Sequence, residues 1–120
     1  MKAPVTEHRQ PSLGEVWQVQ FSPTKGREQA GARPAMIVSV DKFNRGPAEL
    51  VIVIPLTRTH RQIASHVPVP KGEAGLDSDS YIMVEAVRSV SKERLLDYRG
   101  VLTYPRVEQV QHILRVLLNL

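Results

Sequence analysis

The sequence predicts a mainly β domain, a small antiparallel barrel with helical additions. Short segments rich in Val, Ile and aromatic residues recur along the chain, and turn residues separate them at the roughly 8–12-residue spacing of small barrels and sandwiches. Only the last stretch changes to helical spacing. A chain of 120 residues is long enough for one compact domain. Residues 1–12 have no periodic apolar pattern, so we expect a flexible tail there and one domain over 13–120.

The first expected strand is the clearest case of alternation. Trp17, Val19 and Phe21 would share one face, and Gln18 and Gln20 the other. Turn residues follow it directly, so we expect a loop that continues to Pro34.

Two further strands are expected in the middle of the chain. Ala35–Val40 is rich in β-branched residues, and Asp41–Ala48 reads as a turn. Glu49–Leu56 is a near-continuous Val/Ile run, which predicts burial on both faces. Pro55 predicts an edge or a bulge near the end of that strand.

The next part alternates between loops and short strands. Thr57–Ser65 is polar and is expected to be a flexible loop. Val67–Pro70 is extended, and its prolines favour an edge strand. Lys71–Asp79 is rich in turn residues, and strands are expected over Ser80–Val84 and Ala86–Val90.

Helical signals come last. Ser91 would cap a short helix that runs through Tyr98, with Gly100 closing it. Tyr104-Pro105 opens a final amphipathic helix, in which apolar residues recur at Val107, Val110, Leu114 and Leu117. An SH3-like barrel is the nearest named architecture, although periodicity alone does not choose it over an OB-like one.

Composition excludes several classes of protein. The chain has no cysteine, so disulfides, a thiolate nucleophile and a cysteine-ligated metal are ruled out. The longest apolar run, Leu50–Leu56, falls far short of the roughly 20 residues of a membrane span, and the N-terminus lacks the apolar core of a signal peptide. We expect a cytoplasmic protein without a membrane partner. The formal net charge of +4 favours an anionic partner.

The loop from Pro23 to Pro34 is a candidate anion site. Its two glycines permit close backbone approach to a ligand. An arginine fork suits a phosphate because it donates two parallel hydrogen bonds. The polar residues here are Lys25, Arg27, Glu28, Gln29 and Arg33. A solvated surface loop is the alternative.

Thr57 and the histidines are further candidates. A hydroxyl at a strand end can donate to a phosphate oxygen, although a threonine there is more often a turn former. His60 lies in a basic loop and is suited to acid–base chemistry. No histidine pair has metal-ligand spacing, so we expect no metal site and no cofactor, and we expect the histidines at the surface.

Several motifs, taken together, resemble the MazF/PemK family of toxins. Gly14-Glu-Val-Trp17, followed by Pro23-Thr-Lys-Gly-Arg-Glu-Gln-Ala-Gly-Ala-Arg-Pro34, resembles the first hairpin of that family, which reads P-x-x-G-x-E-Q-x-G-x-R-P. The order then continues with Phe43-Asn44, Val53-Ile-Pro-Leu-Thr57, Gly75-Leu-Asp-Ser-Asp-Ser80 and Val87-Arg-Ser-Val-Ser-Lys-Glu-Arg-Leu95. One position departs from the family, since Ala86 stands where many members carry Gln.

The resemblance implies a homodimeric SH3-like barrel that cleaves single-stranded RNA without a metal. Attack by the ribose 2′-hydroxyl would leave 2′,3′-cyclic phosphate and 5′-hydroxyl ends. An antitoxin with a flexible, often acidic segment would silence the toxin. The family's catalytic residues fall on Arg33, Thr57 and Glu28. We expect RNA contacts from Lys25, Arg27, Gln29, Arg58, His60, Arg61 and Arg88.

Two other functions stay open at this point. One is a toxin on the same fold that poisons DNA gyrase, although relatives of that kind generally lack the E-Q-x-G-x-R-P motif. The other is a non-catalytic barrel that binds nucleic acid or peptide, which would not need Arg33 together with Thr57.

Overall fold

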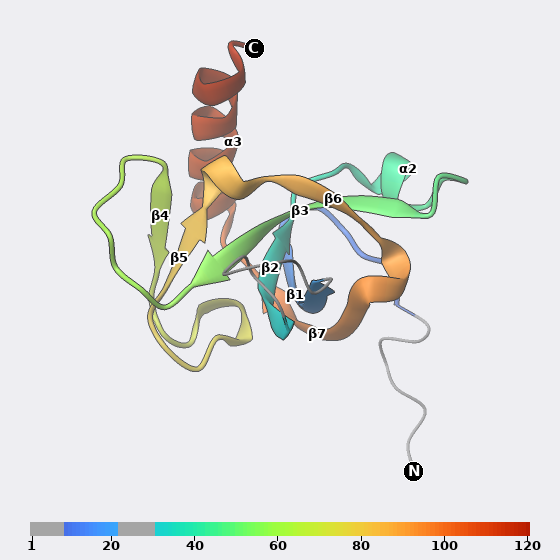
Figure 1. Ribbon diagram of the computed structural model, residues 1–120, viewed down its shortest axis with the longest axis horizontal. Coiled ribbons are helices and arrows are strands. Elements are labelled where there is room, and N and C mark those ends of the chain that lie inside the picture. Colours follow the sequence, from blue (N-terminus) through green and yellow to red (C-terminus); the bar gives the residue numbers. More distant parts are fainter. Residues whose placement is uncertain (1–8, 22–30) are drawn as a thin grey trace.

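The computed structural model describes residues 9–21 and 31–120 (Figure 1). In this part of the chain, seven strands form one antiparallel sheet in the order β4-β5-β3-β2-β1-β7, and β6 pairs with β3 beside that path. The strands are β1 (Glu15–Phe21), β2 (Gly31–Ile37), β3 (Leu50–Thr57), β4 (His66–Val69), β5 (Ser80–Met83), β6 (Arg88–Ser91) and β7 (Leu95–Val101). The helical elements are α2 (Asp41–Asn44), α3 (Tyr104–Leu118) and the 3₁₀ turns η1 (Glu73–Gly75), η2 (Val84–Ala86) and η3 (Lys92–Arg94). The mainly β class with a C-terminal helix is confirmed.

Strand β3 lies at the centre and changes its neighbour on one side. It pairs with β6 through Leu50–Val53 and with β5 through Leu56 and Thr57. Pro55 lies between these two pairings. Strand β3 is thus central in the sheet, but its ladder on this side is interrupted at Pro55, where the missing N–H costs least.

Buried side chains cover both faces of the sheet, as the Val/Ile run of β3 predicts. Trp17, Val19 and Phe21 do share one face, where they pack with Val51 and Val53. The opposite face is covered by α3. Its buried residues include Val16, Met36, Ile54 and Ile82 from the strands and Val110 from the helix.

Helix α3 confirms the expected terminal helix. Its first turn carries Pro105, and it ends at Asn119, which is left-handed at φ 59°. Val107, Ile113 and Leu114 pack against the core beside Val110. The last turn leaves its apolar residues exposed, which are Val116, Leu117 and Leu118.

The short helix expected over Ser91–Tyr98 is wrong. Ser91 does act as a cap, since its Oγ accepts a hydrogen bond from the Glu93 N–H at 3.2 Å. That cap serves only the single turn η3, and the chain then continues as strand β7. Strand β7 pairs with β1 with two register shifts, and such irregularities break the alternation that identifies a strand.

The expected loop up to Pro34 also ends too late, because β2 begins at Gly31. Its first half lacks the apolar residues of a buried strand but pairs with β1, for example Gln18 with Pro34.

The two ends of the sheet are brought together by η1, which follows β4 and packs against β7. The Arg99 guanidinium donates to the Gly75 carbonyl at 2.9 Å. Gly75 has φ +70°, and a Cβ built on it would lie 2.1 Å from the Arg99 carbonyl oxygen. A Cβ on Gly100 would lie 2.6 Å from the backbone of Ala74. Glycine is therefore required on both sides of this contact.

The N-terminal residues described by the structure lie against the sheet. The guanidinium of Arg9 lies 3.6 Å from the centre of the Tyr98 ring and 3.2 Å from the Glu15 carboxylate. The amide of Asn44 donates to the Pro11 carbonyl.

Within the described ranges, no helix has both the length and the apolar character to cross a bilayer.

Candidate functional site

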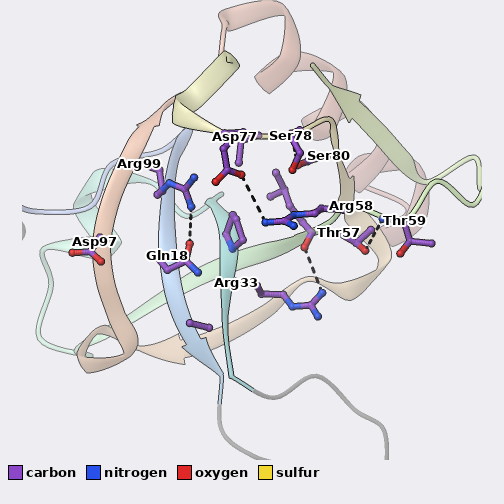
Figure 2. A pocket seen from close by; sticks show the side chains of 14 residues that line it. Gln18, Arg33, Thr57, Arg58, Thr59, Asp77, Ser78, Ser80, Asp97 and Arg99 are labelled. Atoms are coloured by element: carbon purple, nitrogen blue, oxygen red, sulfur yellow. Dashed lines mark hydrogen bonds and ion pairs between the residues drawn. The ribbon is translucent and has the colours of Figure 1, made fainter. Parts of the chain in front are cut away.

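A pocket of about 700 Å³ opens where β2 and β3 separate (Figure 2). The β2–β3 pairing runs only from Ala35 to Ile37 on β2. Beyond it, β2 stays with β1, whereas β3 turns to β5. The lining side chains come from β1, β2, β3, β5, β7 and the segments that follow β3 and η1. They include Gln18, Arg33, Thr57, Arg58, Asp77, Ser80 and Arg99.

Arg33 crosses from β2 toward the end of β3. Its Nη1 donates to the Leu56 carbonyl at 3.4 Å, one residue before Thr57. Its Nε is buried and has no hydrogen-bond partner among the described residues. In the part of the chain that the structure describes, the guanidinium donates only to the Leu56 carbonyl, so the N–H groups that line the pocket can donate to an anion that enters it.

Thr57 is the last residue of β3 and is half-buried. Its Oγ1 accepts a hydrogen bond from the Thr59 N–H at 3.1 Å. That bond fixes the hydroxyl oxygen and leaves its proton free to donate, because no described residue accepts from it. Figure 2 shows the Thr57 hydroxyl and the Arg33 guanidinium on neighbouring strand ends. Both are donors suited to the oxygens of one phosphate.

Two more arginines line the pocket. Arg58 lies 3.8 Å from the Asp77 carboxylate, and both side chains are 76% exposed. Such an exposed pair contributes little to stability, so Arg58 can exchange this partner for a ligand at little cost. Arg99 is held more firmly, since it donates to Gln18 at 2.8 Å and to the Gly75 carbonyl.

Sequence reasoning missed Arg99, Gln18 and Asp77 as lining residues. Arg99 followed a segment expected to be helical, and Gln18 was recognised only as part of the polar face of the first strand. The polar face could have identified Gln18, because an amide on a strand of a small barrel indicates that this face lines a site.

Other candidate residues lie outside the pocket. His60 and Arg61 are in the exposed loop after β3, and the His60 ring stacks on Tyr81. Arg88 lies on β6, with its guanidinium 5.3 Å from the centre of the Phe21 ring. The expected residues Lys25, Arg27, Glu28 and Gln29 lie outside the described residues.

The expectation of surface histidines is wrong for His66. Its side chain is only 5% exposed, and its Nε2 lies 2.8 Å from the Glu85 carboxylate. Burial would raise the pKa of Glu85, but hydrogen bonds with Ser65 and His66 outweigh it, so that pKa lies below its usual value. In the described parts of the chain, no three His, Asp or Glu residues are grouped so that they could hold a metal ion.

Comparison with known proteins gives consistent results. The model of a family described as PemK-like, MazF-like toxin of type II toxin–antitoxin system matches residues 12–118. The chain is 32% identical to the endoribonuclease MazF of Staphylococcus saprophyticus over 108 residues, which is 89% of this chain and 90% of that protein.

Solved structures show the same fold. MazF from Deinococcus radiodurans has a TM-score of 0.80 at 23% identity, covering 93% of this chain and 99% of that one. A mycobacterial endoribonuclease in complex with its cognate antitoxin has a TM-score of 0.75 at 26% identity, covering 92% and 96% of the two chains.

Proposed function

This chain belongs to the PemK-like, MazF-like toxin family of type II toxin–antitoxin systems and is an endoribonuclease of that family; on that premise we propose that it cuts single-stranded RNA without a metal ion. The 2′-hydroxyl of the nucleotide before the cut attacks the adjacent phosphorus atom. The bond from phosphorus to the 5′-oxygen breaks and the leaving oxygen takes up a proton from water, so the products carry a 2′,3′-cyclic phosphate and a 5′-hydroxyl.

The observation that carries this proposal is the convergence of Arg33 and Thr57 at the separating ends of β2 and β3. The guanidinium reaches the Leu56 carbonyl, and the Thr57 hydroxyl follows directly along the chain. Both groups line one open pocket, which is large enough to admit the backbone of a nucleotide.

The reaction needs little from the protein besides alignment and charge stabilisation, because the RNA supplies its own nucleophile. Arg33 and Thr57 donate hydrogen bonds to the phosphate oxygens as negative charge accumulates on them. A guanidinium keeps its proton throughout the physiological pH range, so Arg33 acts electrostatically rather than as the acid that protonates the leaving oxygen.

Glu28 is our candidate for the base that takes the proton from the 2′-hydroxyl. It lies outside the described residues, so the assignment rests on its place in the E-Q-x-G-x-R-P motif. Glu28→Gln keeps the size of the side chain and removes the base. We expect a large loss of cleavage rate, and full activity in this variant would exclude Glu28.

Further basic side chains hold the RNA on either side of the cut. Arg58 and Arg99 line the pocket itself. We also propose backbone contacts from the amide of Gln29 and from the remaining basic candidates Lys25, Arg27, Arg61 and Arg88. Each phosphate neutralised by such a side chain makes binding weaker as salt is raised.

We also propose a homodimer in the cytoplasm and inhibition by an antitoxin with a flexible, acidic segment. The antitoxin proposal is supported by relatives solved with antitoxins, including the mycobacterial endoribonuclease. An acidic segment suits a pocket whose walls carry Arg33, Arg58 and Arg99.

The test is cleavage of a long single-stranded RNA by purified protein in EDTA, with analysis of the product ends. We expect discrete cuts with 5′-hydroxyl and cyclic phosphate ends. A 2′-deoxy substitution at the nucleotide before one cut should abolish that cut alone. A folded protein that cuts no RNA would refute the proposal, as would continued cutting at the deoxy position.

A further inference from the structure

An aromatic stack lies beside the pocket and has no role in the reaction proposed for Arg33 and Thr57. The rings of His60 and Tyr81 are nearly parallel, with 8° between their planes and 4.9 Å between their centres. His60 belongs to an otherwise polar, exposed loop, whereas Tyr81 is half-buried on β5. The histidine is thus the outer layer of the stack.

The stack continues directly from Thr57 across the sheet. Thr57 pairs with Tyr81, and Tyr81 pairs with Pro68 on the next strand. Residues that face each other in an antiparallel ladder point to the same side, and neighbouring strands are about 5 Å apart. A row of outward-facing side chains therefore leads from the Thr57 hydroxyl to the tyrosine ring and on to a proline. The alternate residues Leu56, Ile82 and Val67 are buried on the other side.

A second hollow of about 310 Å³ lies along this row. Tyr81, Pro68 and Ser80 belong to its lining, and Ser80 also lines the larger pocket. The two hollows therefore share one lining residue, at the start of β5. A ligand held by its phosphate at Arg33 and Thr57 can extend over the stack without leaving the surface.

We propose that the stacked rings of His60 and Tyr81 form a binding site for one unpaired base of the RNA next to the cut. The inference rests on the proposed ribonuclease function and assigns this part of its substrate site. Single-stranded RNA is recognised by bases that stack on aromatic side chains. A stack that is already formed loses little side-chain freedom on binding.

The chemistry of the surface favours a base over another phosphate. His60 and Tyr81 present flat rings, and Pro68 extends the apolar surface. Among the described residues, the cation–ring contacts involve Tyr98 and Phe21 and not these two rings. Arg58 lines the larger pocket, and Arg106, which lines the second hollow, is already paired with Glu73 at 2.9 Å. The row thus offers a phosphate site at the Thr57 end and a stacking site at the rings. The scissile phosphate would occupy the first and the base of a neighbouring nucleotide the second.

The experiment combines a protein variant with an abasic substrate. An RNA with a single mapped cut is prepared in versions that each lack one base near the cut, with ribose and phosphates intact. Wild type should lose about 5- to 150-fold in kcat/KM at one flanking position, the range expected when one base–aromatic stack is lost. The His60→Ala variant should be slowed to a similar extent on the intact RNA and should lose nothing further when that base is removed.

Two further variants separate stacking from other roles. His60→Phe keeps a flat ring but cannot transfer protons, so it should retain most of the wild-type rate. His112→Ala, which removes an exposed histidine on α3, is the matched control and should behave as wild type at every abasic position.

The outcomes distinguish failure of this inference from failure of the ribonuclease function on which it rests. If wild type cuts RNA but the losses from His60→Ala and from the abasic position multiply, the base does not stack there and the inference is wrong. Failure of His60→Phe to restore activity would also overturn it. If folded wild type cuts no RNA, the proposed function fails first, and the inference fails with it.

Discussion

The packing of η1 against β7 depends on glycine, and Gly75→Ala should loosen it. Gly75 has φ +70°, and its Cβ would lie 2.1 Å from the carbonyl oxygen of Arg99. Backbone cannot yield as a flexible side chain does, so η1 must move away from β7. Two neighbours separate the causes: Gly100 has the close contact, with Ala74, without the positive φ, and Gly72 has φ +99° with nothing within 4 Å.

The magnitude follows from these two costs. A left-handed conformation costs an alanine about 1–2 kcal/mol, and overpacking against a fixed backbone costs about 1–3 kcal/mol. Gly75→Ala carries both and should lower the free energy of unfolding by about 2–5 kcal/mol. Gly72→Ala carries only the first cost, and Gly100→Ala only the second. At about 4 °C per kcal/mol for a chain of this size, Gly75→Ala should lower Tm by about 8–20 °C.

The assay is urea unfolding of the three alanine variants beside wild type. We expect Gly75→Ala to be the least stable, by close to the sum of the losses in the other two variants. Arg99 donates to the Gly75 carbonyl, so RNA binding should fall in Gly75→Ala as well. Equal stability of Gly75→Ala and Gly72→Ala would refute the reasoning, because it would mean that the close contact costs nothing.

Two other predictions concern stability. Asn44 is fully buried, and its amide donates to the carbonyls of Ser39 and Pro11. Asn44→Ala should cost about 2–4 kcal/mol in urea unfolding, because both carbonyls lose their partner, and a loss below about 1 kcal/mol would contradict this. A hydrogen bond from Arg106 holds the pKa of Glu73 below its usual 4.5, against burial, which would raise it. The stability that this pair contributes is complete above pH 4.5 and disappears as pH falls through the lower pKa of the folded state. The difference in unfolding free energy between wild type and Glu73→Gln should therefore be constant above pH 4.5 and shrink below it; a difference that grew on acidification would exclude this assignment.

The strands that sequence reasoning placed correctly are those with a buried face. Alternation identified β1 through Trp17, Val19 and Phe21, and the Val/Ile run identified β3. Strand β7 was missed because its register shifts against β1 disturb the alternation and because the capping signal of Ser91 is genuine but local. The Ser91 cap determines the conformation of a single turn. The residues after it form a strand because they pair with β1, which is far away in the sequence.

Residues of the candidate site also differ in whether the sequence alone could identify them. Arg33 and Thr57 could be singled out because a loop motif and a strand end carry them. Arg99 and Tyr81 could not, because they reach the site only through the pairing of β7 with β1 and of β5 with β3. A tyrosine in a short strand is ordinary in sequence, and its stacking on His60 depends on how the loop after β3 folds back.

The central claim is that Arg33 stabilises the scissile phosphate from near the start of β2. The most direct test is the single-turnover rate at one mapped cut in EDTA, for wild type, Arg33→Ala and Arg45→Ala. Arg45 is an exposed arginine paired with Asp41, and its variant controls for the loss of one positive charge. We predict a fall of about 10²–10³ for Arg33→Ala, with unchanged cut position and product ends, and a near-wild-type rate for Arg45→Ala. Equal rates for wild type and a folded Arg33→Ala would contradict the account.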